Sequence, residues 1–501
     1  MKIYSTIGMM FLILASHAQT FNKRYGINSD LGYFINCRGS VLTDEYIFTE
    51  LSELTDTIWQ PRIYRMDLSG NVQSVIEYTH PDGVFNLSWA DYIQKHGTNA
   101  IVFSTIYTRY IDSLSFGCLT SIDFDGTVIW QKMYGDSIHG HYFYQVKTTS
   151  DGGLIAIGSA SLISGFPKFY VVKTDSVGNE EWHEYLGFGN KYRQGLWVNE
   201  LLDGSGYVVS GYEDDTSYDP VGLVFVLDPL GNTINWKKYS NWGNYDEQSA
   251  EAILPCNNGG FAFTTAYNVE QVGTLTYTRF PQIVRIDNNL DTLWTCQLME
   301  VNVQSSAQVI YETIEGDFVT VGALLNGIGT SAGHISKVSA SGELLWHRVY
   351  RYAEFGDNLL FDIDPMPGGG YLCTGWMHGF PVLGDSIPDQ DAWLLAVDSM
   401  GCLVPGCDTL DNAISEINPI EFLVYPNPAD QFINIAFSKL ESLNNAEIKL
   451  YNMQGRLIKQ TLLRHNQATY MFDSSMLENG PYLMSIESSR FVTSKKIVIM
   501  H

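Results

Sequence analysis

The sequence predicts an all-β protein: a seven-bladed β-propeller followed by a small immunoglobulin-like antiparallel β-sandwich. A turn-and-tryptophan pattern recurs over the first four fifths of the chain, a second glycine turn keeps step with it, and helical periodicity is scarce. The composition agrees with this fold class. Hydrophobic residues make up 45% of the chain and there are 45 glycines, which supply both a core and many turns.

The first marker is an Asp followed three residues later by Gly and seven residues later by Trp, as at Asp123, Gly126 and Trp130. An Asp side chain accepts hydrogen bonds from nearby backbone amides, and Gly takes the positive φ that closes a short hairpin loop. The pattern therefore predicts a tight turn between two antiparallel strands. Seven copies, some degenerate, begin 52 to 59 residues apart at Asp67, Asp123, Asp175, Asp228, Asp287, Ser339 and Asp398.

The second marker is a glycine turn before a short apolar strand, such as Gly152-Gly153 before LIAIG. Each unit has room for four strands, and runs such as Leu223 to Leu227 are apolar throughout, which predicts strands buried on both faces. A ring of four-stranded sheets covers both faces of every sheet, as in a β-propeller. The Trp residues that recur with the period, and that we expect to pack between blades, are Trp130, Trp182, Trp236, Trp294 and Trp346.

The last unit lacks its Trp strand, and the N-terminal segment can supply it. After Asp398 the chain reads Gly401-CLVPGC, whereas the segment from Phe21 to Gly26 matches the strand that begins at Trp130. We therefore expect the N-terminal strand to complete the seventh blade beside Val397, so that no sheet edge stays unpaired at the seam.

The order of the segments predicts an exported protein of two domains. Lys2, an apolar run from Ile7 to Ala15 and the small-residue site Ser16-His17-Ala18 are typical of a secretory signal peptide. This run is too short to span a bilayer and no later segment is longer, so no integral membrane segment is expected after cleavage. The predicted boundaries are the signal peptide at 1–18, the propeller at 19–407, a linker at 408–419 and a C-terminal β domain at 420–501.

The formal net charge of -26 belongs almost entirely to the propeller, because residues 420–501 carry eight Lys or Arg against seven Asp or Glu. A surface this acidic repels nucleic acid and anionic lipid, and we exclude both as partners. No cofactor is predicted, although calcium is possible because two acidic loops offer oxygen ligands. The Asp residues of these loops are Asp214, Asp215 and Asp219, and Asp385, Asp389 and Asp391.

Seven cysteines leave at least one without a partner in the chain. Cys402 and Cys407 flank a Pro405-Gly406 turn and are predicted to form a disulfide in an oxidising compartment. No further Cys or His stands at zinc-ligand spacing beside them. The other five, which we expect to be buried apolar residues, are Cys37, Cys118, Cys256, Cys296 and Cys373.

Short alternating segments and hairpin turns predict an antiparallel sandwich over residues 420–501. Their order and spacing resemble the C-terminal sorting domain of proteins exported by the type IX secretion system of Bacteroidota. The resemblance implies that the type IX machinery is a partner and that the protein is secreted or attached to the outer-membrane surface. The residues that carry it are Tyr425, Pro426, Asn427, Pro428 and Ala429, the turn at Gly455 and Arg456, Gly480 and Tyr482, and Lys495 and Lys496.

The propeller segment shows no catalytic constellation, so the sequence predicts a protein that is not an enzyme. Ser331 stands in a Gly-x-Ser-x-Gly pattern, but a loop between propeller strands is expected there, whereas a nucleophile elbow needs a strand-to-helix turn. His139 and His141, near Asp136, are expected to be solvated in a polar loop and not to bind a metal. Aromatic residues outside the period, which are available to stack on sugars, are Trp89, Trp197, Trp242 and Trp376.

The favoured function is therefore that of an exported propeller that binds protein or glycan through loops on one face. The alternative is a secreted hydrolase or lyase that acts on polysaccharide through an acidic site in the propeller channel. Paired carboxylates about 5 to 9 Å apart at the channel mouth would favour the enzyme.

Overall fold

The computed structural model divides the chain into two compact units, Met1–Pro405 and Gly406–His501. The described residues form strands and no helix, as predicted, and so none of them belongs to a helix able to cross a membrane. The predicted signal peptide and linker lie outside the described residues. The structure describes residues 20–25, 38–41, 45–55, 58–77, 83–87, 93–97, 100–162, 165–214, 220–239, 249–270, 277–299, 304–326, 330–352, 356–367, 369–379, 390–403, 422–437, 447–452, 457–462, 469–487 and 492–501.

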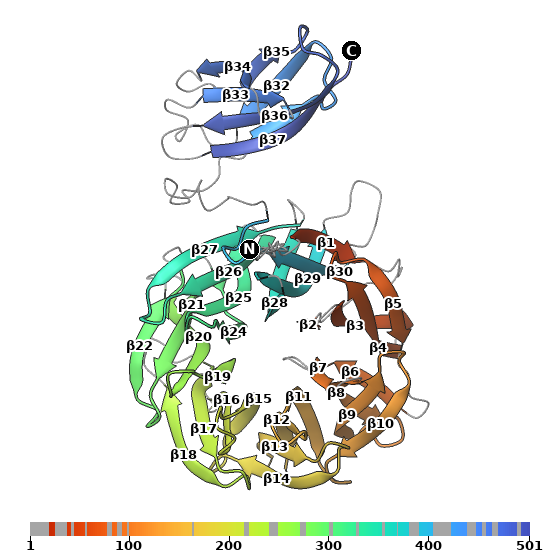
Figure 1. Cartoon of the computed structure of the whole chain (residues 1–501), viewed down its shortest axis with the longest axis vertical. Helices are drawn as coiled ribbons and strands as arrows, with labels where there is room; N and C mark the ends of the chain where they lie inside the picture. The colour runs from red at the N-terminus through yellow and green to blue at the C-terminus, as the bar shows by residue number, and fades with distance from the viewer. Residues whose placement is uncertain are drawn as a thin grey trace, which may run out of the picture. The chain divides into compact units, whose positions relative to one another are not determined.

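The described residues of the first unit form seven antiparallel sheets of four or five strands (Figure 1). Most strands that follow one another in the chain pair antiparallel, except that β6 and β7 both pair with β8 and that β23 and β24 both pair with β25. The sheets contain, in chain order, β2 (Arg38–Val41), β3 (Glu45–Thr55), β4 (Ile58–Asp67) and β5 (Val72–Glu77); β6 (Gly83–Leu87), β7 (Ile93–His96), β8 (Ala100–Arg109), β9 (Ser115–Asp123) and β10 (Val128–Tyr134); β11 (Gly140–Thr148), β12 (Leu154–Ser161), β13 (Lys168–Thr174) and β14 (Glu180–Leu186); β15 (Tyr192–Glu200), β16 (Tyr207–Asp214), β17 (Pro220–Leu227) and β18 (Thr233–Tyr239); β19 (Ile253–Pro255), β20 (Phe261–Glu270), β21 (Tyr277–Ile286) and β22 (Thr292–Gln297); β23 (Gln304–Ser305), β24 (Val309–Glu312), β25 (Phe318–Asn326), β26 (Thr330–Val338) and β27 (Leu344–Tyr350); and β28 (Gly356–Pro365), β29 (Tyr371–Gly379), β30 (Gln390–Val397) and β1 (Phe21–Tyr25).

Neighbouring sheets contact one another in a cycle. Strand β4 contacts β6, β9 contacts β11, β12 contacts β15, β16 contacts β19, β20 contacts β24 and β26 contacts β28. The cycle closes where β28 of the last sheet contacts β2 of the first. Figure 1 shows the sheets around a common centre, with β2, β7, β11, β15, β19, β24 and β28 innermost. This arrangement is consistent with propeller-like blades.

The N-terminal strand forms the outer edge of the last sheet, as predicted. Strand β1 pairs antiparallel with β30, with Phe21 opposite Ala396 and Tyr25 opposite Ala392. The indole Nε1 of Trp393, a fully buried residue, donates a 2.7 Å hydrogen bond to Asn22 Oδ1. The first and last strands of the unit therefore belong to one sheet.

The repeated Asp residues build the turns that their spacing predicts. Asp123 Oδ1 accepts hydrogen bonds from the amides of Asp125, at 3.0 Å, and Thr127, at 2.7 Å. The Gly126 amide donates to the Asp123 carbonyl at 3.0 Å, and Gly126 has φ 89°. The same amide contacts two and four residues on recur at Asp67, Asp175, Asp228, Asp287 and Asp398.

Each of these turns also packs against the outer strand of the preceding sheet. A Cβ added to Gly178 would lie 2.8 Å from the Trp130 ring, and one added to Gly342 would lie 2.7 Å from the Trp294 ring. The glycine is needed because the indole fills the space that a side chain would take. Packing of the periodic Trp residues between sheets is confirmed here, and it recurs for Trp182 with Gly231 and for Trp346 with Gly401.

Trp236 differs from the other periodic tryptophans because the next turn has Leu290 in place of Gly. Leu290 takes a φ of 68° and is fully buried, while Trp236 is 41% exposed and lies against Phe188 and Phe225. The Tyr239 hydroxyl still donates to the Leu290 carbonyl at 2.7 Å. Matching hydroxyl-to-carbonyl bonds join Tyr134 to Gly178, Tyr350 to Gly401 and, at the seam, Tyr25 to Gly70.

Two histidines lie side by side on the paired strands β26 and β27, His334 buried and His347 half-buried. The His334 side chain has no exposed surface, and its Nε2 lies 2.8 Å from the Ser306 carbonyl oxygen, which it can only contact as a donor. The ring centroids of His334 and His347 are 5.2 Å apart, and the Ser336 hydroxyl lies 2.8 Å from His347 Nδ1. Burial lowers the pKa of His334 to about 4.

This lowered pKa predicts a loss of stability in acid. The unfolded histidine binds a proton near pH 6.5, whereas the folded one stays neutral down to about pH 4, so stability falls as the pH falls through this window. The free energy of unfolding should therefore drop by roughly 2 to 3 kcal/mol between pH 7 and pH 4.5 from His334 alone. Urea unfolding of wild type and His334→Gln at both pH values isolates this contribution, because Gln keeps an N–H donor and does not titrate.

The matched control is His183→Gln, since the side chain of His183 is 42% exposed. We expect the control to keep the wild-type pH dependence and His334→Gln to lose the stated part of it. Parallel pH curves for wild type and His334→Gln would contradict the assignment.

The cysteines follow the prediction where they are described. Cys118, Cys256, Cys296 and Cys373 are free and buried. Burial raises the pKa of the Cys118 and Cys256 thiols to about 12, which keeps them unreactive. Cys402 is disulfide-bonded. Cys37 and Cys407 lie outside the described residues, so the pairing of Cys402 with Cys407 stays a prediction.

The described residues of the second unit form two antiparallel sheets around one core. Ile433 and Phe472 of one sheet and Leu450, Met484 and Ile497 of the other belong to the same buried cluster. Two sheets that share a core agree with the predicted sandwich, while its immunoglobulin-like character stays a prediction. The sheets are β31 (Phe422–Tyr425), β32 (Phe432–Phe437) and β35 (Thr469–Asp473), and β34 (Leu457–Leu462), β33 (Glu447–Asn452), β36 (Gly480–Glu487) and β37 (Val492–Ile499).

Candidate functional site

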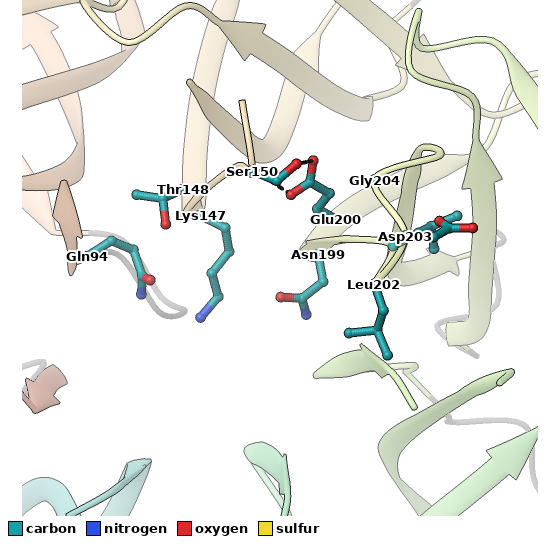
Figure 2. A pocket seen from close by; sticks show the side chains of 10 residues that line it. Gln94, Lys147, Thr148, Ser150, Asn199, Glu200, Leu202, Asp203 and Gly204 are labelled. Atoms are coloured by element: carbon teal, nitrogen blue, oxygen red, sulfur yellow. Dashed lines mark hydrogen bonds between the residues drawn. The ribbon is translucent and has the colours of Figure 1, made fainter. Parts of the chain in front are cut away.

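A pocket of about 470 Å³ opens at the inner strands of three neighbouring sheets in the first unit (Figure 2). Its wall is formed by Gln94 of β7, Lys147 and Thr148 of β11, and Asn199 and Glu200 of β15. Ser150 and residues 201–204, from the hairpins that follow β11 and β15, complete it. A volume of this size suits a small ligand, since ligand pockets measure about 300 to 1,000 Å³.

Strand alternation explains why polar side chains gather here. Gln94, Lys147 and Asn199 each directly follow a fully buried apolar residue of an inner strand, so they point away from the core. Figure 2 shows the ends of these three side chains directed into the same open space. Three consecutive sheets thus present an amide, an ammonium and a second amide on one arc.

Hydrogen bonds within the protein hold the wall of the pocket in place. The Glu200 carboxylate accepts from the Ser150 amide at 2.6 Å and from its hydroxyl at 2.8 Å, which ties β15 to the hairpin of the preceding sheet. Asn199 Nδ2 donates to the Ile253 carbonyl of the next sheet at 2.6 Å. The pocket is therefore largely preformed by contacts between sheets.

Lys147 is the only Lys or Arg among the lining residues that the structure describes. Its Nζ lies 5.9 Å from the ring centroid of Trp197, a distance at which a cation is attracted to an indole face. Trp197 is only 6% exposed, so its ring supports Lys147 and has little surface left to stack on a sugar.

Asp203 adds an ionised carboxylate to the pocket. Hydrogen bonds from the Ser205 hydroxyl and amide lower its pKa below the ordinary value. An ionised carboxylate accepts hydrogen bonds from ligand hydroxyls but does not supply a proton at neutral pH. The described lining therefore suits the binding of a polar ligand better than acid catalysis.

The expectation that His139 and His141 are solvated together is wrong. His141 belongs to β11 and is fully buried, because strand alternation places its side chain on a covered face of the sheet. Its Nε2 lies 2.9 Å from the Tyr185 hydroxyl. His139 Nδ1 lies 2.6 Å from Asp136. Burial lowers the pKa of His141. Among the described residues no group of three His, Cys, Asp or Glu side chains is placed to hold a metal ion.

The expectation of a loop around Ser331 is also wrong, because this residue belongs to β26 and pairs with Leu325 of β25. Its buried hydroxyl donates to Asp357 Oδ1 at 2.9 Å and accepts from the Asn358 amide at 3.1 Å. Ser331 thus links two neighbouring sheets, and it does not stand on the strand-to-helix turn that a nucleophile elbow requires.

The two predicted acidic loops are described only in part. Asp214 ends β16, and Asp391 is buried and forms an ion pair with Arg24 of β1. Asp215, Asp219, Asp385 and Asp389, the other residues considered as possible calcium ligands, lie outside the described residues. Trp89 and Trp242 also lie outside them, and Trp376 is half-buried beside Phe361.

In the second unit, the first group of motif residues lies against the last strand. Tyr425, Pro426, Asn427 and Pro428 are exposed, whereas Ala429 is buried and bridges to Ile499 of β37. The Tyr482 hydroxyl donates to the Glu478 carbonyl at 2.9 Å. Lys495 is half-buried and Lys496 is exposed on β37. Gly480 begins β36, while Gly455 and Arg456 lie outside the described residues.

Residues 423–500 match the secretion system C-terminal sorting domain family. This domain belongs to the type IX secretion system, so the resemblance seen in the sequence is confirmed. A sorting domain of this type indicates export to the cell surface or secretion and handling by the type IX machinery.

For the first unit, the similarity to solved structures concerns the fold alone. No curated protein matches the chain. An ulvan lyase of polysaccharide lyase family PL25 is 9% identical, with 79% of this chain and 100% of the lyase covered and a TM-score of 0.52. An α-L-arabinanase of Penicillium chrysogenum is 11% identical, with 64% and 99% covered and a TM-score of 0.39. A eukaryotic initiation factor is 10% identical, with 60% of this chain and 62% of the factor covered and a TM-score of 0.32.

Proposed function

We propose that this chain is an exported seven-bladed β-propeller that binds a glycan outside the cell without turning it over. The sorting domain at residues 423–500 is the observation that supports the location. Two observations support the propeller: the seven sheets contact one another in a cycle, and the first and last strands of the unit, β1 and β30, belong to one sheet. The Cys402–Cys407 disulfide and the domain limits at 19–407 and 420–501 remain part of this proposal.

The pocket supports glycan as the ligand. Sugars offer many hydroxyl groups, and the arc of Gln94, Lys147 and Asn199 provides amide and ammonium groups at which hydroxyls can donate or accept. The ionised Asp203 adds an acceptor at the same mouth. The preformed wall lowers the entropy lost on binding, because the side chains are already ordered.

Lys147→Ala should weaken glycan binding by tenfold or more, because a hydrogen bond to a charged group contributes about 1.5 to 3 kcal/mol. The measurement is a combined glycan and peptide array, probed with the full exported chain and followed by titration of the best glycan. Lys132→Ala is the matched control, since Lys132 lies on the outer strand β10 and its loss removes the same charge away from the pocket.

Equal losses for Lys147→Ala and Lys132→Ala would show that only the overall charge matters and would contradict the pocket assignment. Binding to peptides and to no glycan would replace glycan by protein as the ligand class.

A polysaccharide hydrolase or lyase is the second candidate, and the fold similarity to the ulvan lyase is the observation that favours it. Glu200 and Asp203 would be its pocket carboxylates. A degradation screen that includes ulvan separates the two candidates. Turnover that disappears in Glu200→Gln or Asp203→Asn would replace the binding proposal by the enzyme.

A further inference from the structure

A segment that is distant in the sequence pairs with the outer edge of the last strand of the sorting domain. Among the described strands, β37 is at the edge of its sheet and pairs with β36 alone. The Ala429 amide donates to the Val498 carbonyl at 2.8 Å, and the Met500 amide donates to the Ala429 carbonyl at 2.8 Å. The segment Asn427–Ala429 therefore covers the outer edge of β37 near its C-terminal end.

Asn427 makes the contacts that its neighbours cannot make. Pro426 and Pro428 have no backbone N–H and cannot donate to a strand edge. The Asn427 side chain accepts a 2.8 Å hydrogen bond from the Val498 amide and donates a 3.2 Å bond to the Lys496 carbonyl. The side-chain amide of Asn427 thus takes the place of a peptide unit and bonds to Val498 and Lys496, which lie 71 and 69 positions further along the chain.

The side chains around this contact face solvent. Tyr425 is 49% exposed, and Pro426, Pro428 and Lys496 are exposed as well. Ala429 and Ile497 anchor the two segments in the core, so the exposed residues contribute little to packing. The two segments meet at Asn427 and together carry an aromatic ring, two prolines and a cation, a set that fits a protein surface with an apolar slot and carboxylates.

We propose that the type IX machinery recognises Tyr425–Pro428 and Lys495–Met500 as one composite surface. Asn427 is the positioning residue that holds the two segments in register. A partner that reads both segments together distinguishes the folded tail from either segment alone. This inference rests on the sorting domain assignment and is independent of the ligand proposed for the first unit.

The test compares Asn427→Ala with Asn479→Ala in the full chain, expressed in a host with a working type IX system. Asn479 Oδ1 accepts a 2.7 Å hydrogen bond from the His501 amide, so its removal loosens the chain end without touching the composite surface. We expect Asn427→Ala to reduce the surface-exposed and secreted fraction at least tenfold and Asn479→Ala to leave it within twofold of wild type. Thermal unfolding of both purified variants checks that the domain still folds.

Two further variants keep the test decisive if Asn427→Ala does not fold. Tyr425→Ala and Lys496→Ala change the composite surface but leave the Asn427 contacts in place, and both should reduce export. Wild-type export of Asn427→Ala, or of both surface variants, would overturn the proposal. Export of a chain that lacks residues 423–500 would instead overturn the sorting assignment itself.

Discussion

A chain that lacks residues 19–30 should melt at a temperature roughly 5 to 10 °C below that of the chain that begins at residue 19. The deletion removes β1, so the backbone groups of β30 that face β1 lose their partners, while those that face β29 keep theirs, and Trp393 loses its bond to Asn22. It also removes Phe21 and Tyr25, which pack on Tyr46 and Phe48 of the first sheet.

The size of this shift follows from the surface that is lost. Two partly buried aromatic side chains and one strand contribute on the order of 5 to 8 kcal/mol, and about 390 residues unfold with an entropy of roughly 0.8 kcal/mol/K. Tryptophan fluorescence follows the first unit selectively, because all 11 Trp residues precede residue 405. Tyr25→Phe, which removes only the hydroxyl bond to Gly70, should shift the melt by no more than about 2 °C. An unchanged melt for the deletion would contradict closure through β1.

Glu213→Gln should lower the free energy of unfolding by about 3 to 5 kcal/mol. The Glu213 carboxylate is buried and lies 2.5 Å from both Arg193 Nη2 and Lys238 Nζ, with Lys191 Nζ at 3.3 Å. Burial alone raises the pKa of Glu213, but the hydrogen bond from Lys238 and the charges of Arg193 and Lys238 lower it below its ordinary value. Gln has nearly the same shape and no charge, so three cations would lose their common counter-ion.

Urea unfolding at pH 7, again followed by tryptophan fluorescence, measures this loss. Glu180→Gln is the matched control, because this carboxylate is 39% exposed beside His183 and an exposed pair contributes only about 0 to 1 kcal/mol. The double variant Arg193→Met with Glu213→Leu should recover part of the stability, since it removes both buried charges together. A loss below about 1 kcal/mol for Glu213→Gln would contradict this prediction, because it would mean that water solvates the three cations as well as the carboxylate does.

The turns could be predicted because their causes are local, and the seam could be predicted because the repeats can be counted. Asp123 and Gly126 follow from hydrogen bonding and φ within five residues, and the missing last strand follows from counting repeats. The same reasoning failed at His141 and Ser331. Both stand in segments that look like polar loops, yet pairing with a neighbouring strand buries them.

The pocket was not predicted because its residues come from three different sheets. The Glu213 network was not predicted because its residues come from different strands of one sheet. Nothing near Glu213 in the sequence indicates that Lys238 will reach it from β18. A weaker signal was present for the wall of the pocket. Glu200 and Glu312 both end an inner strand just before a glycine turn, and both accept a backbone amide from the preceding sheet. Aligning the units by their turns would have shown this recurrence.

The placement of β1 beside β30 also constrains when the first unit can finish folding. Asn22 and Trp393, which join these strands, are 371 residues apart, and a ribosome makes β1 first and β30 almost last. Until β30 has been made, β1 lacks the strand with which it pairs, and Asn22 lacks Trp393. The last sheet of the unit therefore stays incomplete until almost all of the unit has been made.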